Sequence, residues 1–227
     1  MTTTSDTYQT AAHQLTNSGY ALVHTAPEGD ALMSAARSLS RTIGARSLGY
    51  VHLHAANSPE WLGRHTECLT DSTTPLRYFA LGCIRPATEG GQTLLYDGSH
   101  AATILIRQLP DAEHVRLRYH SAHRPETCDH PLIAEHETYG RVLRYRSACE
   151  NNTITAAPNG LTETRLYAQV EAALTASFAY SHWWNPGDLL IVDNHRMLHS
   201  RAPFTGRRHM LRVRYDDPIH HAVTLAE

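Results

Sequence analysis

The sequence contains no lysine, because all 20 of its basic residues are arginine. This absence excludes a Walker phosphate loop, Schiff-base chemistry and a lysine general base. Any side chain that binds a carboxylate through its charge must therefore be a guanidinium or an imidazole. The net charge is small as well, at −2 over 227 residues, so no basic field exists to attract nucleic acid or an anionic membrane. We expect neither as a partner.

Cysteine is scarce, with Cys68, Cys83, Cys128 and Cys149 far apart and no Cys-x-x-Cys pair. That spacing argues against a zinc knuckle or a thioredoxin-type dithiol and favours reduced thiols in the core. Long hydrophobic runs are also missing, since no stretch approaches the roughly 20 apolar residues of a membrane span. The start of the chain is polar rather than a basic segment followed by an apolar one, which predicts a soluble, cytoplasmic protein.

No internal repeat or linker divides the chain, so we expect a single domain over residues 1–227, with helices over about 6–44 and a core over about 48–215. Helices are predicted over residues 6–17, 29–43 and 161–178, the first capped by Asp6 and the second stopped by Gly44. Strands are predicted over residues 48–54, 76–84, 93–96, 115–120, 142–146, 189–192 and 210–215. Helices first and many short strands afterwards favour a mainly β fold with a few helices (α+β), built as a sandwich or barrel.

One imidazole and one carboxylate stand two residues apart in His65-Thr66-Glu67. On an extended backbone they point to the same face and can hold one metal ion. A random chain of this composition would hold about 1.6 such pairs, so the pair alone is weak. A second imidazole, His199, follows a predicted strand and a polar turn near the other end of the chain. Two histidines and one carboxylate on an octahedral ion leave three positions open, as in non-haem Fe(II) oxygenases.

If the metal ion binds an anionic co-substrate, a positively charged side chain is needed nearby to bind the far end of that co-substrate. Arg208 and Arg212 follow His199 on the next predicted strand, where their even spacing places them on one face. A guanidinium can hold a distal carboxylate in a bidentate fork.

Together these residues resemble the taurine dioxygenase and clavaminate synthase-like family of Fe(II)/2-oxoglutarate oxygenases. The resemblance rests on ordered motifs over roughly residues 61–215, namely His65-Thr66-Glu67, Pro75, Gly90-Gly91-Gln92-Thr93, Gly187-Asp188, Asp193-Asn194, His199, Arg201 and Arg208. It implies a cupin-like double-stranded β-helix, or jelly roll, with a metal near its mouth. His65, Glu67 and His199 would then ligate Fe(II). The carboxylate is Glu, as in the clavaminate synthase branch.

The same resemblance assigns Thr93 and Arg208 to the C5 carboxylate of 2-oxoglutarate, and Arg212 to the same co-substrate as a second cation. It implies a dioxygenase that couples conversion of 2-oxoglutarate and dioxygen to hydroxylation of a small molecule. Relatives with Glu in this position suggest an amino acid or amino-acid-derived substrate of specialised metabolism, free or carried on a larger molecule. Desaturation, epoxidation or cyclisation by the same iron chemistry stays open, as does the oligomeric state.

A different class of function rests on His52 and His54. Two imidazoles at i and i+2 on a strand could bind zinc, which would fit a cupin-like hydrolase or a non-catalytic metal-binding jelly roll. No third ligand has a distinctive spacing, and either histidine could instead line the substrate end of the barrel. Arg144 could bind a substrate carboxylate or merely carry solubilising charge on an edge strand.

The polar turn before His199 has its own expectations. Asp193 and Asn194 should fix the turn through hydrogen bonds to the backbone. His195 is expected to be solvated.

Overall fold

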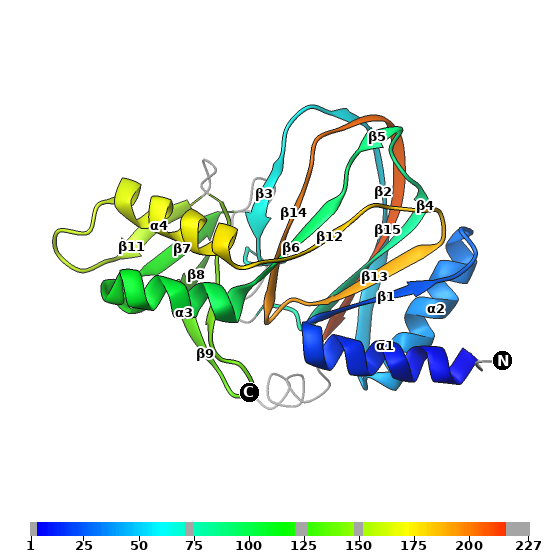
Figure 1. Cartoon of the computed structure of the whole chain (residues 1–227), viewed down its shortest axis with the longest axis horizontal. Coiled ribbons are helices and arrows are strands. Elements are labelled where there is room, and N and C mark those ends of the chain that lie inside the picture. The colour runs from blue at the N-terminus through cyan, green and yellow to red at the C-terminus, as the bar shows by residue number, and fades with distance from the viewer. Residues whose placement is uncertain (1–3, 71–74, 121–126, 148–151, 217–227) are drawn as a thin grey trace.

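Two antiparallel β-sheets form the centre of the molecule (Figure 1). The computed structural model describes residues 4–70, 75–120, 127–147 and 152–216. The larger sheet has the strand order β1-β13-β4-β15-β2, with β5 paired to β15, and the smaller has the order β12-β6-β14-β3. The strands of the larger sheet are β1 (Tyr20–His24), β2 (Arg46–Ser58), β4 (Tyr78–Arg85), β5 (Glu89–Gly90), β13 (Asp188–Asp193) and β15 (Phe204–Asp216). Those of the smaller sheet are β3 (Leu62–His65), β6 (Thr93–Asp97), β12 (Phe178–His182) and β14 (Met197–Arg201).

Apolar side chains that alternate along the strands fill the space between the two sheets. The buried members from the larger sheet are Phe79, Leu81, Cys83, Leu190, Val192 and Met210, and those from the smaller sheet are Leu95 and Met197. Their alternation with outward-facing residues is the period-2 pattern of packed sheets. The predicted mainly β architecture is therefore confirmed.

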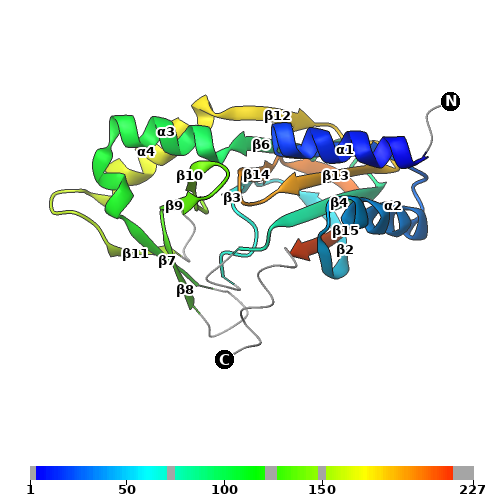
Figure 2. The same ribbon diagram turned by 90° about the horizontal axis from the view of Figure 1, so that it is seen from below.

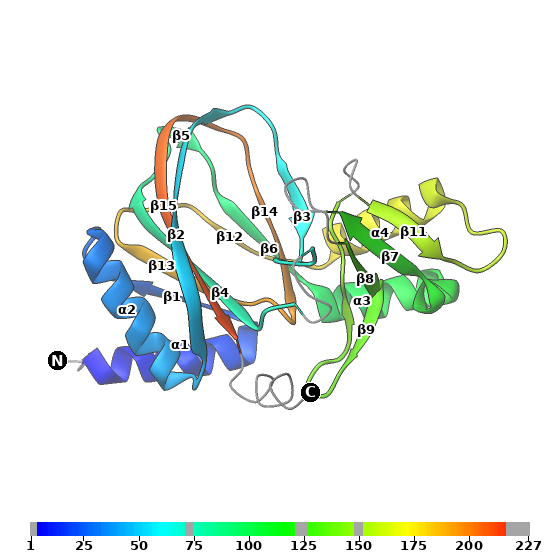
Figure 3. The same ribbon diagram turned by 180° about the vertical axis from the view of Figure 1, so that it is seen from behind.

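Two helices cover the outer face of the larger sheet, α1 (Thr4–Ser18) and α2 (Gly29–Thr42). Leu15 of α1 and Leu32 and Leu39 of α2 are buried there against the sheet. Both helices were predicted, although α1 begins at Thr4, so that Asp6 lies in its first turn rather than at its cap. Figure 3 shows the larger sheet from behind, with β2 at its edge beside β15.

The chain between β6 and β12 forms a lobe beside the two sheets, in which α3 and α4 lie side by side (Figure 2). Its helices are α3 (Gly98–Gln108), the short 3₁₀ helix η1 (Pro110–His114) and α4 (Glu163–Ala176). Its strands are β7 (Arg116–His120), β8 (Thr127–Pro131), β9 (Ile133–His136), β10 (Gly140–Leu143) and β11 (Asn152–Ala156). The lobe buries its own apolar cluster, which includes Leu105, Leu117, Leu166 and Val170.

Helix α3 was not predicted, because the sequence suggested no helix between residues 44 and 161. Its start is determined by Asp97, whose carboxylate accepts hydrogen bonds from the backbone N–H groups of Ser99 and His100. Aspartate at this position satisfies N–H groups that the first turn of a helix leaves unpaired. β-branched residues such as Thr103 and Ile104 lower helix propensity and obscure the pattern. A predicted strand over 142–146 ends earlier, at Leu143.

The cysteine prediction is confirmed only in part. Cys83 is buried in the core, whereas Cys68 and Cys128 are half-buried. Cys149 lies outside the described residues. In the described ranges, every helix is too short or too polar to cross a membrane.

Candidate metal centre

The pairing of β3 with β14 places two histidines directly opposite each other. His65 and His199 are register partners, and their ring centroids lie 4.0 Å apart. Glu67 follows two residues after His65, with its Oε2 3.6 Å from His65 Nε2 and 3.9 Å from His199 Nε2. The three side chains predicted as metal ligands therefore meet at one point, and one ligand atom from each lies within 4.8 Å of the others.

Glu67 lies on a turn after β3 rather than on the strand, and the side chain of a distant residue, Asn194, binds its backbone. The Asn194 side chain accepts a hydrogen bond from Glu67 N–H at 2.7 Å and donates one to the Glu67 carbonyl at 3.1 Å. The same amide donates to the Leu76 carbonyl at 2.9 Å. Cys68, next along the turn, has a positive φ of 62°. Asn194 thus fixes where the carboxylate is presented, a role that the sequence prediction missed.

The ring of His65 is oriented by a hydrogen bond of its own. Its Nδ1 lies 2.8 Å from the Gly63 carbonyl, to which it donates. This bond orients the ring so that Nε2 faces Glu67 and His199. Metal-binding histidines in proteins are commonly held in this way.

The charges at the centre suit a cation. Burial alone would raise the pKa of Glu67, but the neighbouring His65, the Arg212 guanidinium and the nearby His199 hold it well below its usual range. Burial lowers the pKa of His199, and the neighbouring His65 lowers it further. At neutral pH the centre therefore presents an ionised carboxylate and an unprotonated imidazole, the forms that bind metals.

A cavity of about 90 Å³ adjoins the three side chains and is lined by Thr93, Arg208 and Arg212 among others. Thr93 is buried, and its hydroxyl accepts a hydrogen bond from Trp184 Nε1 at 3.2 Å, so its own O–H remains available as a donor. Arg208 points into this cavity whereas Arg207 is exposed. The predicted register of this strand is confirmed.

Within the described ranges, the Nε of Arg208 has no hydrogen-bond partner and no carboxylate forms an ion pair with its guanidinium. Burial and the charge of Arg201 lower its pKa to about 10. A buried donor left unpaired costs free energy, and a carboxylate ligand would remove that cost. The chemistry of these residues fits both a divalent metal and an anionic chelator.

Arg212 occupies a different position from Arg208. Its Nη1 lies 2.9 Å from Glu67 Oε1, and Arg214 Nη2 lies at the same distance from that oxygen. One oxygen of Glu67 therefore faces the histidines while the other faces two guanidinium groups. Arg214 was not singled out in the sequence, although its even spacing from Arg208 and Arg212 could have indicated it.

His52, His54 and Arg144 are not brought to the metal centre. Leu53, which lies between His52 and His54 on β2, lines the cavity. Since neighbouring residues on a strand face opposite ways, the two histidines lie on the outer face. Arg144 is buried, and its Nη1 donates to the carbonyls of Asn194 and His195. It supports the turn before β14 rather than carrying charge on an exposed edge.

The turn itself is mostly as expected. Asp193 accepts a hydrogen bond from His195 N–H, and it also binds Arg77 and Tyr139. The prediction of a solvated His195 is wrong. The residue is 5% exposed, its Nε2 lies 2.7 Å from the Pro75 carbonyl, and burial lowers its pKa to about 3.

Comparison with protein families identifies the chain. Residues 11–214 match the model described as taurine catabolism dioxygenase TauD, TfdA family. The chain belongs to this family. Membership in the TauD/TfdA family confirms the resemblance that the sequence motifs indicated.

Among curated members of related sequence are trimethyllysine dioxygenases. The protein from Meyerozyma guilliermondii is 29% identical over 163 residues, which cover 66% of this chain and 40% of that protein. The mitochondrial protein from Gallus gallus is 27% identical over 166 residues, covering 66% of this chain and 39% of that protein. The aligned region thus spans about 40% of the length of these curated relatives.

Solved structures of similar fold include PvcB from Pseudomonas aeruginosa, with a TM-score of 0.71, 16% identity, and coverage of 93% of this chain and 82% of that chain. A second structure is titled as PvcB, an Fe, alpha-ketoglutarate dependent oxygenase from an isonitrile synthetic pathway, with a TM-score of 0.72, 17% identity and the same coverage. A taurine dioxygenase from Burkholderia xenovorans has a TM-score of 0.57 at 19% identity, covering 80% of this chain and 71% of that chain. These likenesses confirm the jelly-roll fold.

Proposed function

We propose that the protein is an Fe(II)/2-oxoglutarate-dependent oxygenase that hydroxylates an amino acid or an amino-acid-derived substrate. The observation that carries the proposal is the meeting of His65, Glu67 and His199 beside Arg208, whose Nε has no hydrogen-bond partner among the described residues. When bound, ferrous iron and 2-oxoglutarate would supply activation of dioxygen coupled to decarboxylation of the keto acid to succinate.

Each side chain of the centre has a separate task in this proposal. His65, Glu67 and His199 hold the metal and leave its remaining positions open. Arg208 grips the distal carboxylate of 2-oxoglutarate in a bidentate fork, and the Thr93 hydroxyl donates to the same group. Family membership and the lack of lysine both support a guanidinium in this role.

Arg212 is proposed to serve both Glu67 and the co-substrate. In the structure it binds the outer oxygen of Glu67. Because it also lines the cavity beside Arg208, its charge attracts the anionic keto acid. Glu67 itself keeps the net charge of the centre low before a metal binds.

The substrate class is supported by two observations. Trimethyllysine dioxygenases, whose name gives an amino-acid substrate, are among the relatives. A second pocket of about 160 Å³ shares Arg212 with the metal cavity and is also lined by Val51, Tyr50 and Arg214. Guanidinium groups next to exposed apolar side chains suit a carboxylate with a hydrocarbon body. The isonitrile-pathway PvcB supports a place in specialised metabolism, with the substrate free or carried on a larger molecule.

The test is turnover by the full chain with Fe(II), ascorbate, 2-oxoglutarate and a panel of free and carrier-bound amino acids. We expect succinate together with a product heavier by one oxygen atom, and neither from His199→Ala. Loss of two hydrogens from the substrate would instead indicate desaturation or ring closure. Tight zinc binding with no succinate and no effect of 2-oxoglutarate would overturn the proposal and favour a zinc-binding jelly roll.

A further inference from the structure

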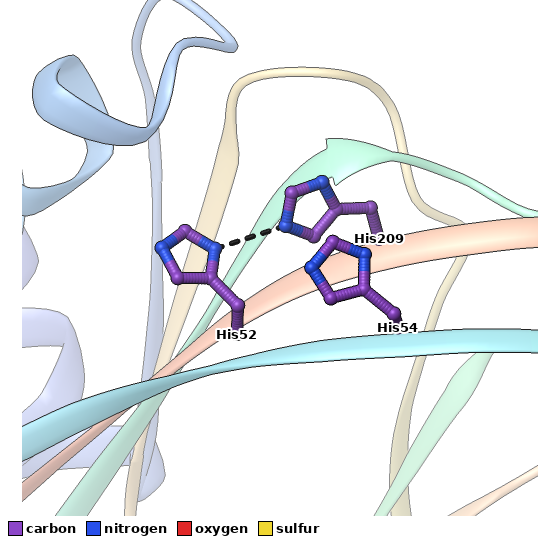
Figure 4. A group of neighbouring side chains, drawn as sticks. All are labelled: His52, His54 and His209. Atoms are coloured by element: carbon purple, nitrogen blue, oxygen red, sulfur yellow. Dashed lines mark hydrogen bonds between the residues drawn. The ribbon is translucent and has the colours of Figure 1, made fainter.

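A second group of three histidines lies on the outer face of the larger sheet (Figure 4). His52 and His54 come from β2 and His209 from β15. His54 and His209 are register partners, with ring centroids 3.9 Å apart. His52 Nδ1 lies 2.9 Å from His209 Nε2. One ring nitrogen from each histidine lies within 4.8 Å of the others.

The register of the sheet holds these side chains together. Residues alternate between faces along each strand, so Leu53 and Met210 line the interior cavity while the histidines on either side of them point outward. His52 and His54 are exposed and His209 is half-buried. The cluster is therefore reachable from solvent, and its backbone positions are fixed by strand pairing rather than by a loop.

We propose that His52, His54 and His209 form a second metal site that binds a late first-row divalent cation, with Zn²⁺ as the reference ion. Imidazole nitrogens suit zinc, nickel and copper, and three of them with a water as fourth ligand make a tetrahedral zinc site. Zinc–nitrogen bonds of about 2.0–2.1 Å in that geometry separate the nitrogens by about 3.3 Å. The nitrogens of His52 and His209 are 2.9 Å apart and all three ligand nitrogens lie within 4.8 Å of one another, so rotations of the rings can bring them to that spacing.

Burial lowers the pKa of His209, and the adjoining His54, His52 and Arg85 lower it further. The 2.9 Å contact between His52 and His209 is a hydrogen bond, so one proton lies between the two nitrogens. A bound metal ion would replace that proton. Arg85 is the register partner of His209 on β4, but it is exposed, so solvent screens its charge.

The metal ion would link the edge strand of the larger sheet, β2, to the interior strand β15. β2 is the edge strand of the larger sheet, and β15 is the only strand that pairs with it in the described chain. A metal ion bound by both strands would stabilise the folded state by mass action. It would sit on the opposite side of β15 from Arg208 and Arg212.

The experiment counts zinc on the full chain by competition with a chromogenic chelator. We expect two equivalents on the wild type, because the centre of His65, Glu67 and His199 is also a zinc-binding set. Glu67→Ala should keep one tight equivalent, and His54→Asn/His209→Asn should lose one. His100→Asn, which removes an exposed histidine on α3, is the matched control and should keep both.

A second measurement guards against loss of the fold. Without metal, His54→Asn/His209→Asn should melt at nearly the same temperature as the wild type, since His54 is exposed and His209 is only half-buried. In the Glu67→Ala background, zinc should raise the melting temperature, and adding the two His→Asn changes should abolish that rise and weaken zinc binding at least about 100-fold. No tight zinc on Glu67→Ala, or equal zinc affinity in the cluster variant and His100→Asn, would overturn the second site. The result is independent of turnover, because Glu67→Ala removes the proposed oxygenase activity and leaves this site intact.

Discussion

At the scale of single residues, two adjacent arginines have opposite surroundings. Arg207 is exposed, whereas Arg208 lies in the metal cavity without a hydrogen-bond partner for its Nε in the described structure. The difference follows from one residue of register on β15, since neighbouring side chains on a strand face opposite ways. Comparing variants of Arg207 and Arg208 therefore separates an effect on the metal cavity from the general effect of removing one positive charge.

We expect Arg208→Met to raise the KM for 2-oxoglutarate by about 10- to 100-fold, which corresponds to loss of one or two charge-assisted hydrogen bonds. Arg208→Lys should recover only part of this loss, because an ammonium cannot form the fork. Arg207→Met is the control and should leave KM unchanged. Steady-state kinetics of succinate formation measures all three, and an equal KM for Arg208→Met and wild type would refute the assignment.

Asn194 is predicted to act through Glu67 rather than on any ligand. Asn194→Ala leaves the Glu67 N–H and two carbonyls in buried surroundings without their partner. We expect Fe(II) affinity to fall about 10- to 100-fold and the free energy of unfolding to fall by about 1–3 kcal/mol. Asn57→Gly, which removes an exposed side-chain acceptor for Gly206, should not change Fe(II) affinity. Equal losses of iron affinity in both variants would contradict a positioning role.

At the scale of elements, the start of α3 depends on one carboxylate. Asp97 caps the helix and also binds Arg196 at 2.7 Å. Burial would raise its pKa, but the hydrogen bonds from Arg196, Ser99 and His100 lower it below the usual value. The stabilisation from ionised Asp97 is therefore complete above about pH 4 and is lost as the pH falls through the lowered pKa.

Asp97→Ala should lower the free energy of unfolding by about 1–2 kcal/mol at pH 7. Asp97→Asn keeps a capping side chain and should lose less. The gap between wild type and Asp97→Asn should be constant above about pH 5 and shrink below about pH 4, as measured by urea unfolding at several pH values. If the difference in unfolding free energy between wild type and Asp97→Asn grew as the pH fell, the predicted direction of the pH dependence would be wrong.

The turn before β13 requires glycine for two reasons. Gly187 has a φ of 91°, and a Cβ there would lie 2.0 Å from the Thr25 carbonyl oxygen. Gly160 has a similar φ of 85° with nothing within 4 Å, so it is a matched control. We expect Gly160→Ala to cost about 1–2 kcal/mol for the left-handed backbone alone and Gly187→Ala to cost about 2 kcal/mol more. Equal unfolding free energies for the two variants would disprove a steric role for Thr25.

Prediction from the sequence succeeded where the pattern is local. Helix α2 followed from apolar residues at helical spacing, and the shared face of Arg208 and Arg212 followed from even spacing on one strand, whereas the inward direction of Arg208 was implied by the family motif. It failed for β14, because Met197–Arg201 is a short buried strand whose polar residues resemble a turn. The hydrogen bonds of Asn194 to Glu67 depend on how two distant turns approach, which spacing does not encode.

At the scale of the whole molecule, the pairing of strands brings distant residues into two clusters. The β3–β14 pair joins His65 and His199, and the β2–β15 pair joins His54 and His209. The first cluster was found from the sequence because an ordered family motif supplies its third member. For the second cluster the sequence indicated only His52 and His54, since nothing in the sequence showed which strand would lie beside β2.

The lobe of α3, α4 and the strands between them gives the molecule its elongated outline (Figure 1). It contributes Arg144, whose side chain supports the turn that begins β14, and a carbonyl of Tyr145 that accepts from the Thr66 N–H at 2.8 Å. The lobe is thus tied to the backbone on both sides of the metal centre. Its packing is therefore expected to affect metal affinity as well as stability.

The most direct test of the proposed function is anaerobic binding of Fe(II) and then 2-oxoglutarate to the His54→Asn/His209→Asn variant, which isolates the metal centre. We expect one equivalent of Fe(II), followed by one of 2-oxoglutarate with the visible charge-transfer absorption of a keto acid chelated to ferrous iron. Adding Glu67→Ala should abolish both, and adding Arg208→Met should weaken only the second step. Tight binding of 2-oxoglutarate without iron, or unchanged iron binding after Glu67→Ala, would contradict the proposed centre.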